Sequence, residues 1–239
     1  NKIPRVQGEV DLNLNIFLIM ARISHTSEKS GSSNPTSKFL EYKSNDKAFS
    51  YYDREAKETV KVELPLKFVF LQNYHSVRGW NDASASGIYS NEVFYIGSEP
   101  MTVKAFKGGT IATGLYKDIK AEITNAGGKY HRSIYVMLED GTLANISLKG
   151  SSVRQWSDFM EANKQLADGQ FVEVNSANEE KKGSVKYSTP NFTIGAKLSK
   201  GDSSKADEVA GQLKTYLDEY FSKSTEREVI EAEEVELDF

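Results

Sequence analysis

Cationic and aromatic residues alternate through the middle of the chain, between residues 67 and 135. The residues that carry this pattern are Lys67, Tyr74, Arg78, Trp80, Tyr89, Lys104, Lys107, Lys129, Tyr130 and Arg132. Cations of this kind follow a phosphate backbone, and the faces of aromatic rings stack on nucleobases, each stack being worth about 1–3 kcal/mol. The ten residues are therefore predicted to form a groove for a single nucleic-acid strand.

Burial is the competing explanation for any aromatic residue in this region. Trp80 is the preferred stacking residue, because it stands in a polar segment bounded by glycines, where a core role is harder to supply. Tyr130 and Arg132 share one face of a predicted strand and flank His131, which suits a nucleic-acid surface or equally a solvated sheet face. Trp156 is predicted to belong to the core.

The end of the chain is strongly acidic. Residues 226–239 contain seven acids and one base, which leaves 27 acids and 29 bases for residues 1–225, a net charge of about +2. Such a segment repels itself and is predicted to stay extended. A terminal Phe with its carboxylate would be a compact ligand for a partner, and the alternative is an ordinary solubilising terminus. The residues predicted to meet a partner are Glu233, Glu234, Glu236, Leu237, Asp238 and Phe239.

Several kinds of chemistry are excluded or unsupported. The chain has no cysteine, which excludes disulfides, thiolate metal sites and a cysteine nucleophile and is typical of a reducing compartment. His25, His75 and His131 are far apart and form no metal-ligand pattern, and no phosphate-binding loop or serine nucleophile motif is present. We expect no cofactor, no metal and no catalytic residue. With no signal peptide or membrane span in the sequence, we expect a cytoplasmic protein that does not meet a membrane.

Hydrophobic patterning predicts many short strands and three helices. A buried strand is predicted within residues 10–23, and residues 76–93 are predicted to be a structured loop. The Asp140-Gly141 pair predicts a hairpin between residues 130–138 and 142–148. The further predicted strands are 38–43, 49–52, 59–64, 66–74, 101–106, 171–174 and 193–198, with a flexible excursion at 175–188. The predicted helices are 110–123, 151–164 and 205–223.

This order of elements predicts an α+β, β-rich fold. Five-stranded oligonucleotide-binding (OB) barrels fit the layout, so we expect an OB-like small antiparallel barrel with added helices and loops, although other folds fit as well. One elaborated domain is predicted for residues 1–224, followed by a disordered acidic tail at residues 225–239.

The acidic segment 231–239, closing on Phe239, resembles the tails of bacterial and bacteriophage single-stranded DNA-binding proteins. It lacks the Asp-Ile-Pro-Phe ending of the bacterial proteins and is nearer to the phage versions. In that family the tail mimics DNA, competes for the body's own groove and docks replication and repair partners. Residues 64–109 are also similar to an uncharacterised group of phage-encoded proteins of the replication and recombination type.

We therefore expect a phage single-stranded DNA-binding protein of the host cytoplasm, binding without sequence preference. Its tail would inhibit binding and recruit replication or recombination proteins, and a homodimer is compatible with this reading. One alternative is a protein-interaction or virion-assembly factor that never meets nucleic acid, for which the modest charge of the body argues. Another is a metal-dependent nuclease built from scattered acids.

Overall fold

The computed structural model describes residues 34–164 and 169–236, with side chains as far as residue 222. The predicted strand within residues 10–23 lies outside this part. The strands are β1 (Lys38–Lys43), β2 (Ala48–Asp53), β3 (Glu58–Val62), β4 (Leu66–Asn81), β5 (Ser86–Ser90), β6 (Met101–Ala105), β7 (Gly109–Gly114), β8 (Gly128–Leu138), β9 (Leu143–Lys149), β10 (Gln170–Lys182) and β11 (Val185–Lys197). The helices are α1 (Tyr116–Asn125), α2 (Ser151–Ala162) and α3 (Lys200–Glu236).

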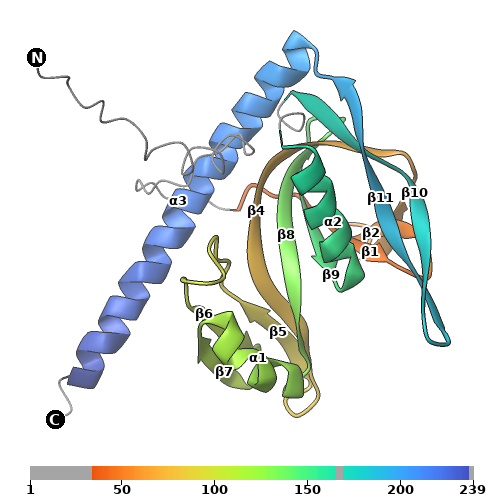
Figure 1. Ribbon diagram of the computed structural model, residues 1–239. Helices are drawn as coiled ribbons and strands as arrows, with labels where there is room; N and C mark the ends of the chain where they lie inside the picture. The colour runs from red at the N-terminus through yellow and green to blue at the C-terminus, as the bar shows by residue number, and fades with distance from the viewer. Residues whose placement is uncertain (1–33, 165–168, 237–239) are drawn as a thin grey trace, which may run out of the picture.

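The described strands form one mixed sheet of 11 strands (Figure 1). Its main path runs β3-β2-β1-β9-β8-β4-β5-β6-β7, and β10 pairs with both β4 and β11. The pairs are antiparallel except for β1 and β9, which are parallel. The predicted α+β, strand-rich class is confirmed. The path does not return on itself, however, so the sheet is open and the predicted antiparallel barrel is not confirmed.

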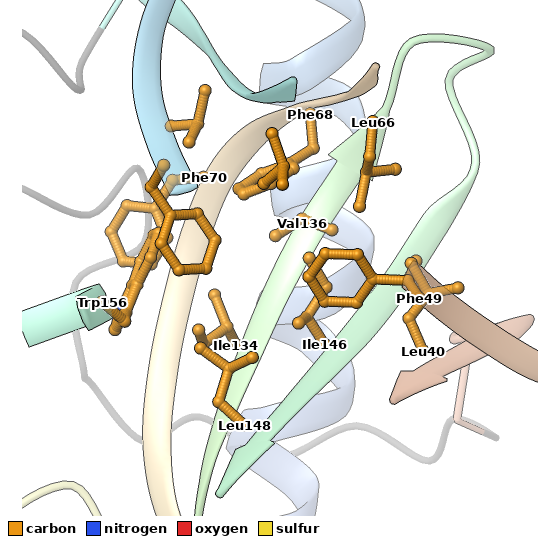
Figure 2. Packing of buried hydrophobic residues seen from close by; sticks show 14 of the residues in the cluster. Leu40, Phe49, Leu66, Phe68, Phe70, Ile134, Val136, Ile146, Leu148 and Trp156 are labelled. Carbon is orange, nitrogen blue, oxygen red and sulfur yellow. The ribbon is translucent and has the colours of Figure 1, made fainter. Parts of the chain in front are cut away.

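The central strand β4 is buried on both faces along its first half. Phe68 and Phe70 belong to a cluster with Trp156 of α2 (Figure 2). Val69, between them, belongs to a second cluster with Leu213 of α3. Because successive side chains of a strand point to opposite faces, α2 and α3 cover opposite faces of the sheet. We call these the α2 face and the α3 face.

Helix α1 covers the far end of the α2 face. Its residues Ile119 and Ile123 pack in a third cluster with Val77 of β4. Gly128 of β8 lies directly beneath Ile123, since a Cβ at Gly128 would stand 2.6 Å from the Ile123 side chain. Gly128 and Ile134 are six residues apart on β8, so they lie on the same face, that of the α2 cluster. Helices α1 and α2 therefore share a face. Opposite α1, the α3 face carries no described helix cluster.

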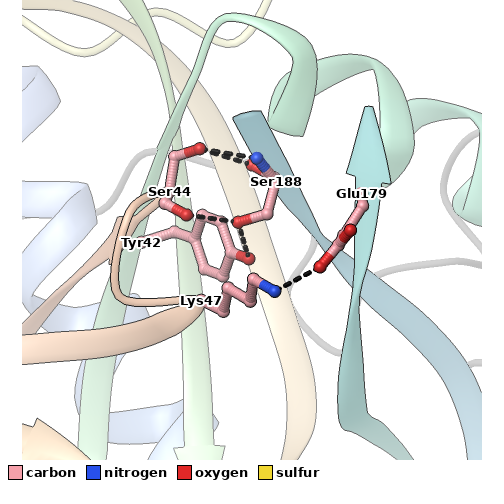
Figure 3. Close-up of polar contacts among 5 residues, drawn as sticks. All are labelled: Tyr42, Ser44, Lys47, Glu179 and Ser188. Atoms are coloured by element: carbon pink, nitrogen blue, oxygen red, sulfur yellow. Dashed lines mark hydrogen bonds and ion pairs between the residues drawn. The ribbon is translucent and has the colours of Figure 1, made fainter. Parts of the chain in front are cut away.

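One half of the sheet curls toward itself without pairing its ends. The turn after β1 meets the β10–β11 hairpin through side-chain hydrogen bonds (Figure 3). The hydroxyls of Tyr42 and Ser188 lie 2.8 Å apart, and the Ser188 N–H donates to Ser44 Oγ at 2.7 Å. Lys47 and Glu179 add an exposed ion pair. These contacts hold the curl around the Phe68 cluster where a closed barrel would have a strand ladder.

Three loop and helix predictions are wrong. Residues 76–93 form the end of β4, a turn and β5, because the pairing of β4 with β8 continues as far as Gly79. Within the predicted helix 110–123, β7 pairs with β6 up to Gly114, and α1 begins only at Tyr116. The predicted flexible excursion 175–188 is the β10–β11 hairpin, which turns at Gly183 with φ of 62°.

The last helix is longer than the predicted amphipathic helix 205–223. Val209, Leu213 and Leu217 are buried against the sheet as expected. The described backbone then stays helical as far as Glu236, where the sequence predicts an extended tail from residue 225. Once a helix has formed, each added residue gains a hydrogen bond without a new nucleation cost. Residues 237–239 lie outside the described part.

The two tryptophans offer a matched stability test. Trp156 has no exposed surface, whereas Trp80 is 57% exposed. Trp156→Ala should lower the free energy of unfolding by about 3–5 kcal/mol, because it leaves a cavity in the α2-face core. Trp80→Ala should change it by about 0.5 kcal/mol or less. Urea unfolding followed by circular dichroism measures both, and equal losses would contradict the assignment of Trp156 to the core.

Candidate nucleic-acid interface

A row of side chains crosses four strands on the open part of the α3 face. Lys129 of β8 lies opposite Arg78 of β4, Arg78 opposite Tyr89 of β5, and Tyr89 opposite Lys104 of β6. Residues directly opposite in antiparallel pairs share a face, with Cβ atoms about 4.5–5.5 Å apart. The strand register therefore assembles three cations and one ring into a continuous line.

Exposed aromatic rings stand beside this row. Trp80 lies two residues beyond Arg78 on the same face of β4 and is 57% exposed. Tyr89 is 45% exposed, and its ring contacts that of Phe106, which is 80% exposed, with centroids 5.8 Å apart. Water-exposed rings gain little from folding, so packing does not explain them. We call Arg78, Trp80, Tyr89, Lys104, Phe106 and Lys129 the aromatic–cation surface.

The charges of this surface are not neutralised by ion pairs. Among the residues that the structure describes, no carboxylate lies within ion-pair distance of Arg78, Lys104 or Lys129. Like charges directly opposite each other destabilise a sheet, and Arg78 faces Lys129 in this way. The row therefore opposes folding slightly and favours the approach of an anion.

One acidic group lies near Arg78 below the surface. Burial raises the pKa of the Glu92 carboxyl, while hydrogen bonds from Ser133 and Tyr135 and the charge of Arg78 act against the rise. The Tyr135 hydroxyl donates to Glu92 at 2.8 Å. This carboxylate is engaged within the protein, so it moderates the positive row from one side without pairing with it.

Close backbone contacts hold the end of β4 that carries Trp80. Asn81 Nδ2 donates to the Ala126 carbonyl at 3.0 Å. A Cβ at Gly79 would stand 2.3 Å from the Gly127 carbonyl oxygen, and Gly127 has a φ of +95°, so both positions require glycine. Trp80 thus sits on a strand fixed against the turn between α1 and β8, rather than in the loop predicted for it.

His131 and Lys149 extend the positive region by one further row. His131 lies opposite both Ser76 and Lys149, on the face that carries Lys129. Burial, then the charges of Arg78 and Lys149, lower the pKa of His131 to about 4, while the nearby carboxylate of Glu41 acts against this shift. The sequence analysis missed Lys149. The Asp140-Gly141 hairpin could have revealed it, because the register of a hairpin fixes which residues face each other.

Four predicted site residues lie elsewhere. Tyr74 is buried and packs on Phe221 of α3, with ring centroids 5.3 Å apart, so its predicted stacking role is wrong. Tyr130 and Arg132 alternate with His131, so their side chains lie on the α2 face, on the other side of the sheet. Lys67 is at the other end of β4, 3.4 Å from Glu139. The sequence showed neither the face taken by Tyr130 and Arg132 nor the helix α3 that covers Tyr74.

Two further groups of predicted residues lie at the margins of the surface. Lys107 is exposed in the turn after Phe106, and its N–H donates to Ser86 Oγ at 3.1 Å, so it borders the aromatic–cation surface. Glu233, Glu234 and Glu236 lie on the last turns of α3, of which the backbone is described. Leu237, Asp238 and Phe239 lie outside the described residues.

No metal site is formed by the described residues: they contain no cluster of three or more His, Asp or Glu side chains suited to a metal ion. None of the helices in this part of the chain is long and apolar enough to cross a membrane. No protein-family model, curated protein or solved structure matches the chain. The surface must therefore be interpreted from its own chemistry.

Protonation of His131 should make stability depend on pH. Its pKa of about 4 in the folded state lies below the usual 6.5, so the unfolded chain binds the proton more tightly. The stability that comes from keeping His131 neutral in the folded state is fully present above pH 6.5. It is lost as the pH falls toward 4. Between pH 7.5 and 4.5 it should amount to about 2 kcal/mol.

His131→Gln should reduce the pH dependence by that amount in urea unfolding measured at both pH values. His75→Gln is a useful comparison, because burial lowers the pKa of His75 further, to about 3. An unchanged pH dependence in His131→Gln would contradict the buried neutral state.

Proposed function

We propose that this protein binds single-stranded nucleic acid, as a DNA-binding protein of the phage replication and recombination type. The observation that supports the proposal is the aromatic–cation surface, where three exposed rings stand beside three cations without ion-pair partners on one sheet face. This is the combination that sequence-independent single-strand binding requires.

The row of cations would follow the phosphate backbone. Lys129, Arg78 and Lys104 lie on β8, β4 and β6, three of four neighbouring strands spaced about 4.8 Å apart, so the row is about 14 Å long. A strand of nucleic acid running across the sheet would keep its phosphates over these cations. Lys149 and Lys107 would extend the contact at either side.

The rings would hold the bases. Trp80, Tyr89 and Phe106 present their faces or edges to solvent, and stacking accepts any base because each has a π-face. Binding would therefore have little sequence preference. In the family that the acidic end resembles, the body is an OB-like barrel, whereas here the cations and rings would bind nucleic acid on an open sheet.

The acidic end of α3 would regulate binding. Extended tails in the resembling family compete with DNA for the groove, but here the backbone is helical to Glu236. In Figure 1 the last turns of α3 extend clear of the sheet. Acidic side chains at a helix C-terminus oppose the helix dipole and one another. These turns would therefore unwind readily to reach the groove of the same chain, or meet that of a second copy, and when displaced would recruit replication partners.

Removing an exposed ring should weaken DNA binding. Trp80→Ala and Phe106→Ala should each raise the dissociation constant for labelled oligothymidylate about 5- to 100-fold, which corresponds to one lost stack. Fluorescence anisotropy at low salt measures this effect. Tyr52→Ala is the matched control, because Tyr52 is 60% exposed on β2, far along the sheet, and should bind as the wild type does.

Three outcomes would contradict the proposal or the assigned position of the nucleic acid. Absence of wild-type binding at low salt would overturn the proposal and favour a protein-interaction or virion-assembly role for the exposed rings. Equal loss in Trp80→Ala and Tyr52→Ala would place the nucleic acid elsewhere. A magnesium-dependent loss of the oligonucleotide would indicate the nuclease alternative.

The salt dependence tests the cation row separately. Binding should weaken steeply between 50 and 200 mM salt, because each phosphate contact releases counterions. Lys129→Gln should lower the slope of log K against log[salt] by about 1, while Lys61→Gln, at an exposed position on β3, should leave it unchanged. Equal slopes in all three proteins would exclude Lys129 from the phosphate path.

Deleting residues 226–239 tests the role of the acidic segment. The dissociation constant for oligothymidylate should fall at low salt and converge with that of the full chain at high salt, where charge competition is screened. The comparison uses anisotropy titrations of both proteins. An unchanged dissociation constant at low salt would remove the autoinhibition proposal and leave the binding surface unaffected.

A further inference from the structure

A cavity of about 670 Å³ lies on the α2 face, away from the aromatic–cation surface. It is open to solvent and is lined by β4, β8, α2 and the segment 94–98 that follows β5. Its walls are largely apolar and include Phe70, Phe94, Trp156 and Met160. Phe70 and Trp156 lie together in Figure 2, with ring centroids 5.5 Å apart. A volume of this size is in the range of small-molecule sites.

One cationic side chain, Arg132, lines the cavity from β8. None of the carboxylates in the described part of the chain forms an ion pair with it. Its Nε atom is buried without a hydrogen-bond partner. A guanidinium removed from water without a counter-ion is unfavourable. The chain itself supplies no carboxylate partner for this charge among the described residues.

The neighbours of Arg132 do not neutralise its charge. Its Nη1 lies 2.5 Å from Nε2 of His75, and the other ring nitrogen of His75 lies 2.6 Å from the Tyr130 hydroxyl. A guanidinium cannot accept a hydrogen bond, so Nε2 accepts from Arg132 and Nδ1 donates to Tyr130. Burial and Arg132 lower the pKa of His75 to about 3, and the ring is therefore neutral at physiological pH.

The remaining charged groups of the cavity are on α2 and just beyond its end. Glu161 and Lys164 both line it and are exposed. Their formal charges cancel, and solvent screens them more than it screens Arg132. Arg132 also has a side-chain hydrogen bond with Tyr130. The interior thus presents apolar walls with a single positive group, whose Nε–H is left without a partner.

We propose that this cavity binds a small carboxylate with an aromatic or branched apolar body. The carboxylate would pair with the guanidinium of Arg132, whose Nε–H has no partner in the protein and whose planar fork matches two carboxylate oxygens. The apolar body would lie against the partly exposed wall residues Phe94 and Met160. The site is on the sheet face opposite the aromatic–cation surface, so it does not depend on nucleic-acid binding.

The test compares 3-phenylpropionate with its neutral isostere 3-phenylpropionamide. Trp156 lines the cavity, so its fluorescence reports binding, and Trp80→Phe removes the signal of the other tryptophan. The carboxylate should bind at least 10-fold more tightly than the amide. Isothermal titration of the wild-type chain gives the same ratio without any substitution.

Arg132→Gln should abolish the preference for the carboxylate, while Lys164→Gln at the rim should keep it. Circular dichroism of each variant establishes that it is folded. Equal affinity of the wild type for the two compounds, or no binding of either at millimolar concentration, would overturn the proposal. Retention of the full preference in folded Arg132→Gln would overturn it as well. Oligothymidylate binding should be the same in Arg132→Gln and wild type, so failure here is separate from failure of the nucleic-acid proposal.

Discussion

The alternation of side chains along β4 is the constraint on which the rest of the structure depends. From Phe68 to Leu71 each residue enters one of two apolar cores, Phe68 and Phe70 under α2 and Val69 and Leu71 under α3. A slip of one residue would move each set into the core shaped for the other. The strand also pairs with β8, β10 and β5, so its register fixes the position of most other elements.

The same alternation has a different result where the helices end. Beyond Tyr74 one face of β4 stays covered by α1 through Val77, and the other carries Arg78 and Trp80 with no described helix cluster over them. The surface therefore forms on a strand that is rigid because its opposite face is buried. Neighbouring cations without ion-pair partners and exposed rings lower the stability of the folded protein. They lie on a part of β4 whose other face is held by the packing of α1. That balance is what a preformed binding surface requires.

Adjacent residues separate the two proposed sites. His75 and Arg132 face the apolar cavity, while their chain neighbours Ser76 and His131 face the positive surface. Burial lowers the pKa of both histidines, although their partners differ, Arg132 and Tyr130 for His75 and Ser147 for His131. The sheet is thus a thin partition between a surface suited to a long polyanion and a cavity suited to a single small anion.

Local pattern in the sequence determined the hairpin at Asp140-Gly141, the helix that buries Trp156 and the apolar stripe of α3, because each depends on residues close in the chain. It also determined the charge division between body and acidic end. Five of the ten predicted site residues, Arg78, Trp80, Tyr89, Lys104 and Lys129, lie together on one face, and their binding role stays a prediction. Only the tertiary structure decided which face each strand residue takes. Tyr130 and Arg132 lie off the surface because the register of β8 with β4 turns them to the α2 face, and Tyr74 is lost to it because α3 covers that part of the α3 face. The open sheet and the length of α3 were likewise decided by strand pairing and helix propagation, which composition alone does not specify.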